Sequence, residues 1–102
     1  MKEITSEEEF STLLSENEKV VIDFWAPWCG PCKSVLPLVE SVQSETNLVS
    51  FAKVNVDENQ SITERFSINS IPCFVKFYNK KEIGRLVGIT SKDKFKNFCE
   101  TF

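Results

Sequence analysis

The chain has 102 residues, of which 41% are hydrophobic and nine are phenylalanine, enough for one core and one domain spanning residues 1–102. Its net charge of -3 and scattered basic residues argue against a nucleic-acid partner and favour a monomer. The N-terminus lacks the apolar stretch of a secretion signal, and no segment approaches the roughly 18 apolar residues of a membrane span, so we expect a cytoplasmic protein without a membrane partner.

The first predicted elements are a strand, a helix and a second strand. Residues 2–5 predict a short edge strand, and Thr5 or Ser6 can cap the helix that follows. The nearly continuous apolar run of residues 19–26 predicts a strand that helices cover on both faces. Asp23 interrupts that run, and a charged residue in a central strand is costly unless it has a partner or a chemical task.

Cys29 and Cys32 follow this strand, separated by two residues at the predicted start of a helix. Such a pair can close a disulfide and open it again. Unpaired backbone N–H groups and the positive end of the helix dipole favour a thiolate at the helix start, so Cys29 is the expected nucleophile. Cys32 lies one turn further on, where we expect it to be deeper, less accessible and suited to resolving a mixed disulfide.

A metal centre and a static disulfide are the alternatives for these two cysteines. A structural zinc site needs four ligands, but the chain has no histidine, and its other cysteines, Cys73 and Cys99, stand alone. A structural bridge across two residues would close too small a loop to stabilise the fold much. We therefore predict a redox pair and no metal.

Residues 23–33 resemble the active-site segment of the thioredoxin family almost residue for residue; they read Asp-Phe-Trp-Ala-Pro-Trp-Cys-Gly-Pro-Cys-Lys. Residues 52–57 resemble the family as well, and the likeness extends over essentially the whole chain. It implies a thioredoxin fold of the α/β class, with a mixed, mainly parallel central sheet flanked by helices in the order β-α-β-α-β-α-β-β-α. The implied function is a general protein disulfide reductase that donates electrons to cytosolic redox enzymes.

The same resemblance carries expectations about cofactors and partners. It implies no bound cofactor, because the redox group is the Cys29–Cys32 disulfide itself. NADPH would recharge that disulfide through a thioredoxin reductase. Ribonucleotide reductase, peroxiredoxin and methionine sulfoxide reductase are candidate substrate proteins.

Asp23 has two interpretations. It can pair structurally with Lys53, or it can accept a proton from Cys32, since burial raises the pKa of a carboxyl toward neutrality. The cost of an idle buried charge favours the second interpretation. The resemblance agrees, because the matching aspartate of thioredoxins has that role and a lysine matching Lys53 lies beside it.

The helix after the cysteine pair is predicted over residues 32–44, with Pro37 kinking it. Residues 49–57 predict the second central strand, because they are rich in β-branched and aromatic side chains. Residues 57–59 can cap a short helix that ends near residue 66.

Ile71 and Pro72 precede a predicted strand over residues 74–78. The proline alone is compatible with simple strand entry. In thioredoxins the matching bond is cis and lies against the cysteine pair, where the residue before proline offers backbone groups to an extended substrate. The resemblance thus implies a substrate-binding surface framed by six residues: Trp28, Gly30, Pro31, Ile71, Pro72 and Gly88.

Cys73 departs from the family pattern, in which threonine often follows this proline. It is either a small residue standing in for threonine or an accessible regulatory thiol near the active-site rim, open to glutathionylation or an intermolecular disulfide. Cys99 falls on the apolar face of the last predicted helix and is expected to be a packed, inert thiol.

The C-terminal part predicts an antiparallel hairpin and a helix. Residues 79–81 connect the strand of residues 74–78 to one over residues 82–87, and the missing Asn-Gly signal predicts a longer or less tight turn. Gly84 can mark a bulge. Thr90 or Ser91 is expected to cap the last helix.

Two other classes of function remain open. Disulfide oxidases and isomerases share the fold, although by resemblance Gly30 and Pro31 point to the reducing end of the family, and the missing signal peptide agrees. A non-enzymatic module would instead dock a partner on the apolar rim around Trp28. Replacing both cysteines with serine separates these classes, because docking would survive and reduction would not.

Overall fold

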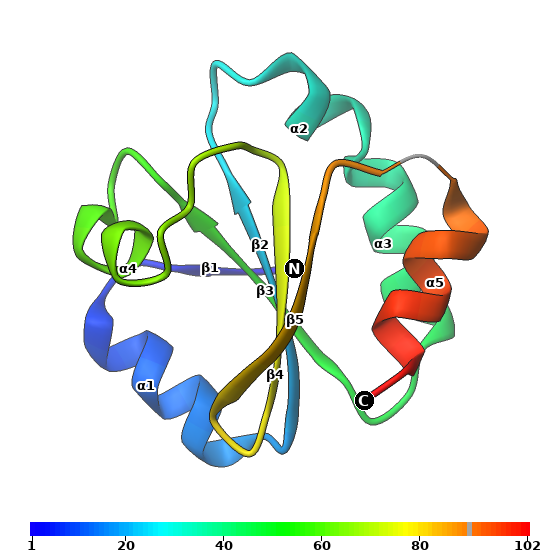
Figure 1. Ribbon diagram of the computed structural model, residues 1–102, viewed down its shortest axis with the longest axis horizontal. Coiled ribbons are helices and arrows are strands. Elements are labelled where there is room, and N and C mark those ends of the chain that lie inside the picture. Colours follow the sequence, from blue (N-terminus) through cyan, green and yellow to red (C-terminus); the bar gives the residue numbers. More distant parts are fainter. Residues whose placement is uncertain (90) are drawn as a thin grey trace.

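The computed structural model describes residues 1–89 and 91–102, and five strands and five helices lie within them. In chain order these are β1 (Lys2–Ile4), α1 (Glu7–Glu16), β2 (Lys19–Trp25), α2 (Gly30–Ser34), α3 (Leu36–Glu45), β3 (Ser50–Asn55), α4 (Gln60–Arg65), β4 (Cys73–Tyr78), β5 (Lys81–Val87) and α5 (Lys92–Glu100). The strands form one sheet in the order β1-β3-β2-β4-β5. Figure 1 shows α1 and α4 on one side of this sheet and α3 and α5 on the other.

The sheet is mixed, as expected, with two parallel and two antiparallel pairings between neighbouring strands. Both β1 and β2 pair in parallel with β3, whereas β4 pairs antiparallel with β2 and with β5. Only β4 therefore runs opposite to the other strands described. The predicted cap of the first helix is confirmed as well. The Oγ of Ser6 accepts the backbone N–H of Glu9 at 3.1 Å and so caps α1.

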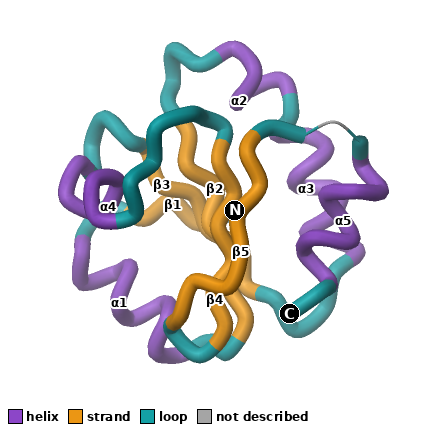
Figure 2. The backbone as a smooth tube through the Cα atoms, in the orientation of Figure 1, coloured by secondary structure: helices purple, strands orange, loops and turns teal. Residues whose placement is uncertain are grey.

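The predicted helix over residues 32–44 is in fact two helices, α2 and α3, which Figure 2 shows as separate segments. Pro37 lies in the first turn of α3, and Val35 caps both helices with φ -87° and ψ -9°. Proline has no N–H for the bond to residue 33, and its ring would clash with that residue's carbonyl. The chain therefore breaks where we expected a kink, and the short helix that carries the cysteines is separate from the helix that packs on the sheet.

The hairpin between β4 and β5 is tighter than the sequence indicated. Asn79 and Lys80 form a two-residue turn with positive φ angles of 50° and 73°, the conformation that favours right-twisted hairpins. The prediction of a looser turn is wrong because an asparagine followed by lysine adopts the turn without glycine. The pairing register shifts between Lys76 and Phe77, next to the partner Gly84, as expected of a bulge.

Ser91 caps α5, because its Oγ accepts the backbone N–H of Lys94 at 3.2 Å. The alternative cap, Thr90, lies outside the described residues. At the other end of α5, Lys76 reaches across from β4 and donates to the carbonyl oxygens of Phe98 and Thr101. A buried lysine thus binds the last carbonyl groups of the C-terminal helix, a contact that the sequence did not suggest.

Two apolar clusters fill the space between the sheet and the helices. The cluster under α1 and α4 is built around three phenylalanine rings, Phe10, Phe66 and Phe77, whose centroids lie 5.3 to 5.8 Å apart. The cluster under α3 and α5 contains Phe74, Phe95 and Cys99. Cys99 is fully buried, and burial raises the pKa of its thiol to about 12, so it is the packed thiol that its helical position predicted.

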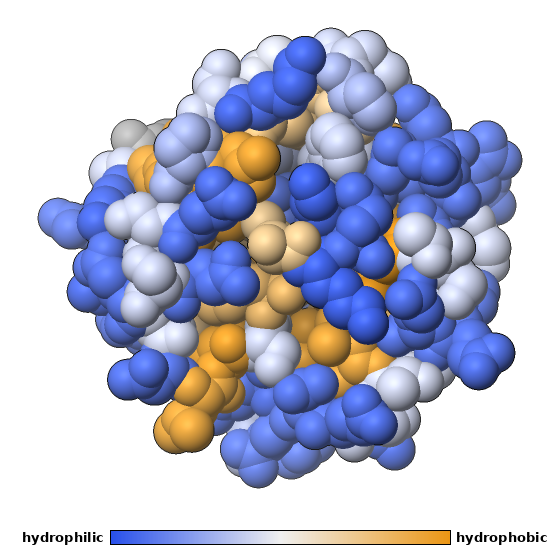
Figure 3. Space-filling view, turned by 180° about the vertical axis from the view of Figure 1, so that it is seen from behind, coloured by the Kyte–Doolittle hydropathy of each residue, from blue (hydrophilic) through white to orange (hydrophobic). Residues whose placement is uncertain are grey.

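Hydrophilic side chains cover most of the face seen in Figure 3, with apolar surface showing between them. Within residues 1–89 and 91–102, none of the helices is both long and apolar enough to cross a membrane. Two of the large apolar side chains that remain exposed are Trp28, the residue before Cys29, and Val87, the partner of Cys73 at the start of β4.

Candidate active site

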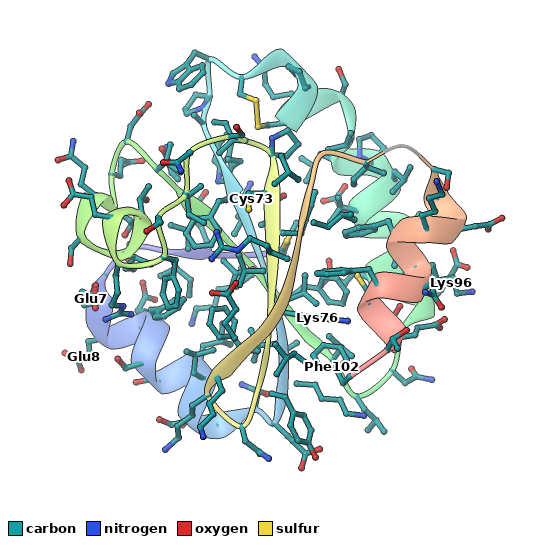
Figure 4. The ribbon with its side chains drawn as sticks, in the orientation of Figure 1. Glu7, Glu8, Cys73, Lys76, Lys96 and Phe102 are labelled. Atoms are coloured by element: carbon teal, nitrogen blue, oxygen red, sulfur yellow. A yellow bond between two sulfur atoms is a disulfide. The ribbon has the colours of Figure 1, made fainter. Side chains whose placement is uncertain are left out.

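Cys29 and Cys32 are joined by a disulfide at the start of α2, beyond the end of β2, and Figure 4 shows this bond at one end of the sheet. The local sequence explains the position. Cys29 is the N-cap of α2, and its Sγ accepts the backbone N–H of Cys32 at 3.2 Å. Pro31 lies in the first turn, where its missing N–H leaves no bond unmade.

The two sulfur atoms differ in what they face. Cys29 Sγ lies 4.0 Å from the carbonyl oxygen of Ile71, whereas Cys32 lines a small cavity beside Asp23. The exposed fractions are 5% for Cys29 and 4% for Cys32, so the predicted difference in accessibility is not found in this oxidised state. The bond holds both sulfurs in one apolar cluster with Ala26, which explains the similar burial.

The predicted substrate-binding residues come together around the disulfide. The Ile71–Pro72 bond is cis, as the resemblance implied, and the Pro72 carbonyl accepts the N–H of Gly88 at 2.8 Å. Trp28 is 68% exposed. Gly30 and Pro31 are exposed as well. An open backbone and an apolar ring therefore surround the sulfur that faces Ile71.

Gly88 has a φ of 75°, and no atom lies near enough to obstruct an added Cβ. We expect Gly88→Ala to lower the free energy of unfolding by about 1 kcal/mol, because an L-residue pays for the left-handed conformation even where space is free. Urea unfolding of the oxidised protein measures this loss. Gly30→Ala is the matched control, since Gly30 has equal space without a positive φ. Equal effects from both variants would contradict the argument.

Trp28 has a partner that sequence reasoning missed. Its indole Nε1 donates to Asp57 Oδ2 at 2.8 Å, which fixes the ring beside the disulfide. Asp57 ends the second segment that resembles the family, so the resemblance marked it. Only the parallel pairing of β2 and β3 shows that their ends, and hence these two side chains, are neighbours.

Asp23 is 3% exposed, and its Oδ1 has no hydrogen-bond partner among the described residues. Burial raises the pKa of this carboxyl to about 7, against the opposing charge of Lys53 and with a smaller contribution from Glu3 in the same direction. Lys53 forms its ion pair with Glu3, at 3.8 Å. The structural pairing of Asp23 with Lys53 is therefore not the arrangement observed.

A cavity of about 30 Å³ lies between Asp23, Cys32 and Lys53. Its volume is sufficient for about one water molecule. The Asp23 carboxyl group and Cys32, whose thiol carries a proton in the reduced protein, therefore line the same small cavity.

Cys73 is 2% exposed and lies in the apolar cluster under α1 and α4, while its neighbour Phe74 lies in the other cluster. Side chains alternate along a strand, so the thiol points into the core (Figure 4). Burial raises the pKa of the thiol. The hypothesis of an accessible regulatory thiol is wrong, and the other interpretation, a small residue in a strand, fits the position.

Comparison with known proteins identifies the family. The family model for thioredoxin matches residues 1–101. The chain belongs to the thioredoxin family. It is 45% identical over 92 residues to a thioredoxin of Mycoplasma pneumoniae, covering 90% of each chain. It is 41% identical over 91 residues to a bifunctional thioredoxin reductase/thioredoxin of Mycobacterium leprae, covering 88% of this chain and 20% of that protein.

Solved structures agree with this assignment. The structure of Plasmodium falciparum thioredoxin superposes with a TM-score of 0.91 at 36% identity, covering 97% of this chain and 96% of that one. Together with the Cys29–Cys32 disulfide at the active-site position, membership of this family makes the chain a thiol–disulfide oxidoreductase that reduces protein disulfides. In the part of the chain described, no cluster of histidine, cysteine and acidic side chains is placed to hold a metal ion.

Proposed function

We propose that Cys29 is the attacking thiol and Cys32 the resolving thiol in the reduction of substrate disulfides. The Cys29 thiolate attacks one substrate sulfur, forms a mixed disulfide and releases the other substrate sulfur as a thiolate. Cys32 then attacks Cys29 Sγ and releases the second substrate sulfur. Two electrons pass to the substrate, and the Cys29–Cys32 disulfide of this structure is the product state. The supporting observation is that Cys29 Sγ faces the Ile71 backbone while Cys32 faces Asp23.

Asp23 is the proposed base for the second step. A carboxyl whose pKa is about 7 takes up and returns a proton near neutral pH, which matches the task of deprotonating Cys32. Lys53 lines the same cavity, and its charge favours the ionised carboxylate. We propose that one water molecule in the cavity carries the proton between Asp23 and Cys32.

An extended segment of the substrate binds beside the disulfide in this proposal. The carbonyl oxygen of Ile71 lies next to Cys29 Sγ and can accept a backbone N–H from such a segment. Gly88 presents no side chain, and the exposed ring of Trp28 and side chain of Val87 provide apolar contact. These groups recognise backbone and apolar surface, and therefore suit many substrate proteins.

Reducing equivalents come from NADPH through a thioredoxin reductase in this proposal. The relative from Mycobacterium leprae supports it, because its name joins both activities in one protein. We further propose that the chain is a cytoplasmic monomer whose substrates are redox enzymes such as ribonucleotide reductase, peroxiredoxin or methionine sulfoxide reductase.

Reduction of a model protein disulfide, such as that of insulin, by NADPH and a thioredoxin reductase tests the function. The protein should accelerate the reaction, and Cys29→Ser/Cys32→Ser should not. A pull-down with the double variant separates the remaining alternative, since a docking module would retain its partner without either thiol. Absence of any acceleration by the unaltered protein with an active reductase would contradict the proposal.

A further inference from the structure

Lys53 lies between two carboxylates in adjacent strands. In the register of the sheet, Lys53 of β3 is the partner of Glu3 on β1 and also of Asp23 on β2. Paired residues on neighbouring strands point to the same face of a sheet, so the three side chains form a row across it. The carboxylate of Glu3 is at the sheet edge, and that of Asp23 is buried. Lys53 is the partner of both residues in the register of the sheet.

The ammonium group lies at the edge carboxylate. Its Nζ is 3.8 Å from Glu3 Oε1 and 4.6 Å from the centre of the Trp25 ring. The same indole donates from Nε1 to Glu3 Oε2 at 3.2 Å, which fixes the direction of the glutamate. Glu3 thus contacts both Lys53 and Trp25, and the ammonium group of Lys53 forms its ion pair at the edge strand β1, whereas none with Asp23 is found among the described residues.

The position of this charge matters for the buried carboxyl. An opposite charge in direct contact with a carboxylate lowers its pKa by about 1 to 3 units, which would make it a weaker base. With Lys53 at Glu3, the Oδ1 of Asp23 has no hydrogen-bond partner among the described residues. The Asp23 side chain lines the cavity shared with Cys32. The charge of Glu3 itself acts in the same direction, since it opposes ionisation of Asp23.

We propose that Glu3 is a positioning residue for the redox reaction: it holds the Lys53 ammonium group against Trp25, away from Asp23, and so keeps Asp23 able to accept the Cys32 proton. This inference rests on the proposed role of Asp23 as base. Glu3 touches neither sulfur and acts through Lys53.

Other ionisable groups surround Asp23 and stay constant in the comparison. Lys33 of α2 lines the cavity together with Asp23 and Lys53, and Cys32, which also lines it, does not titrate while it is in the disulfide. Cys73 of β4 lies on the opposite side of the sheet, and its thiol is neutral near pH 7 because burial raises its pKa. A change in the titration of Asp23 after a substitution at Glu3 is therefore assigned to Glu3 and Lys53.

The test is a pH titration of the Asp23 carboxyl carbon by NMR in the oxidised protein, with Asp23→Asn to assign the signal. Glu3→Gln retains an acceptor for the indole and removes the charge that attracts Lys53. We expect it to lower the pKa of Asp23 by about 0.5 to 1 unit. Glu3→Asp keeps the charge but shortens the side chain, and should lower the pKa in the same direction by a smaller amount.

Two comparisons decide whether Glu3 acts through the lysine. Glu8→Gln removes the same charge from an exposed position on α1 and should leave Asp23 unchanged. In a Lys53→Met background, Glu3→Gln should lose more than about half of its effect, as a double-mutant cycle measures. An unchanged or raised pKa in Glu3→Gln, an equal fall in Glu8→Gln, or an undiminished fall in the Lys53→Met background would overturn the proposal.

The measurement is independent of turnover. The NMR titration needs no substrate and no reductase, so a protein inactive on disulfides would contradict the proposed function without affecting this result. In stopped-flow assays of an active protein, the pH profile of mixed-disulfide resolution should move to lower pH in Glu3→Gln by the same shift as the carboxyl titration.

Discussion

Replacing Cys29 with serine should lower the rate of protein disulfide reduction by at least about a thousandfold, because an alcohol is a far weaker nucleophile than a thiolate and forms no disulfide with Cys32. Cys32→Ser should behave differently. It leaves the thiol that faces Ile71 in place and removes the group that resolves the mixed disulfide. The variant should therefore accumulate a covalent adduct with the substrate, visible as an added mass on a gel without reductant.

The matched control is Cys73→Thr. This substitution alters a thiol in the apolar cluster under α1 and α4 and should leave the rate of reduction unchanged. The assignment of roles depends on the asymmetry between the two active-site variants. Trapping of substrate by Cys29→Ser in place of Cys32→Ser would reverse the roles.

Asp23→Asn should stabilise the oxidised protein above neutral pH. The pKa of Asp23 is raised from 3.8 to about 7, so the folded state binds its proton more tightly than the unfolded state does. The contribution of this group to stability is therefore fully present below about pH 4 and is lost as the pH rises through about 7. Removing the charge should raise the free energy of unfolding at pH 8 by up to about 4 kcal/mol.

Urea unfolding at pH 5 and pH 8 measures this effect. The gain should be much larger at pH 8, and the stability of Asp23→Asn should depend less on pH than that of the unaltered protein. Glu40→Gln is the control, because Glu40 is an exposed carboxylate on α3. A variant less stable than the unaltered protein at pH 8, or one with the same pH dependence, would show that Asp23 is not held at a raised pKa.

The sequence allowed much of this structure to be predicted, because the informative patterns are local. An apolar run interrupted by Asp23 gave a buried strand, and two cysteines at the start of a helix gave the redox pair. The resemblance added the cis bond before Pro72 and the glycine that contacts it. These features depend on residues close together in the chain or on a motif that fixes their context.

The features that the sequence did not predict depend on contacts between distant segments. Whether Cys73 points to solvent or into the core follows from the phase of β4 relative to its neighbours. The role of Glu3 follows from the register of β1 on β3, and three residues of a short edge strand give little sign of their pairing. Pro37 shows a different limit. A proline cannot donate the backbone hydrogen bond of a continuous helix, and both a kinked helix and two separate helices are compatible with that loss.

The reduction potential of the Cys29/Cys32 pair tests the proposed direction of electron flow most directly. The protein is equilibrated with defined thiol and disulfide buffers, and free thiols are trapped for mass analysis. A value at or below about -250 mV, near or under the glutathione poise of the cytosol, is the expected result for a reductase. A value above about -180 mV would contradict that function, because the pair would then give up its disulfide to other proteins and act as an oxidase or isomerase.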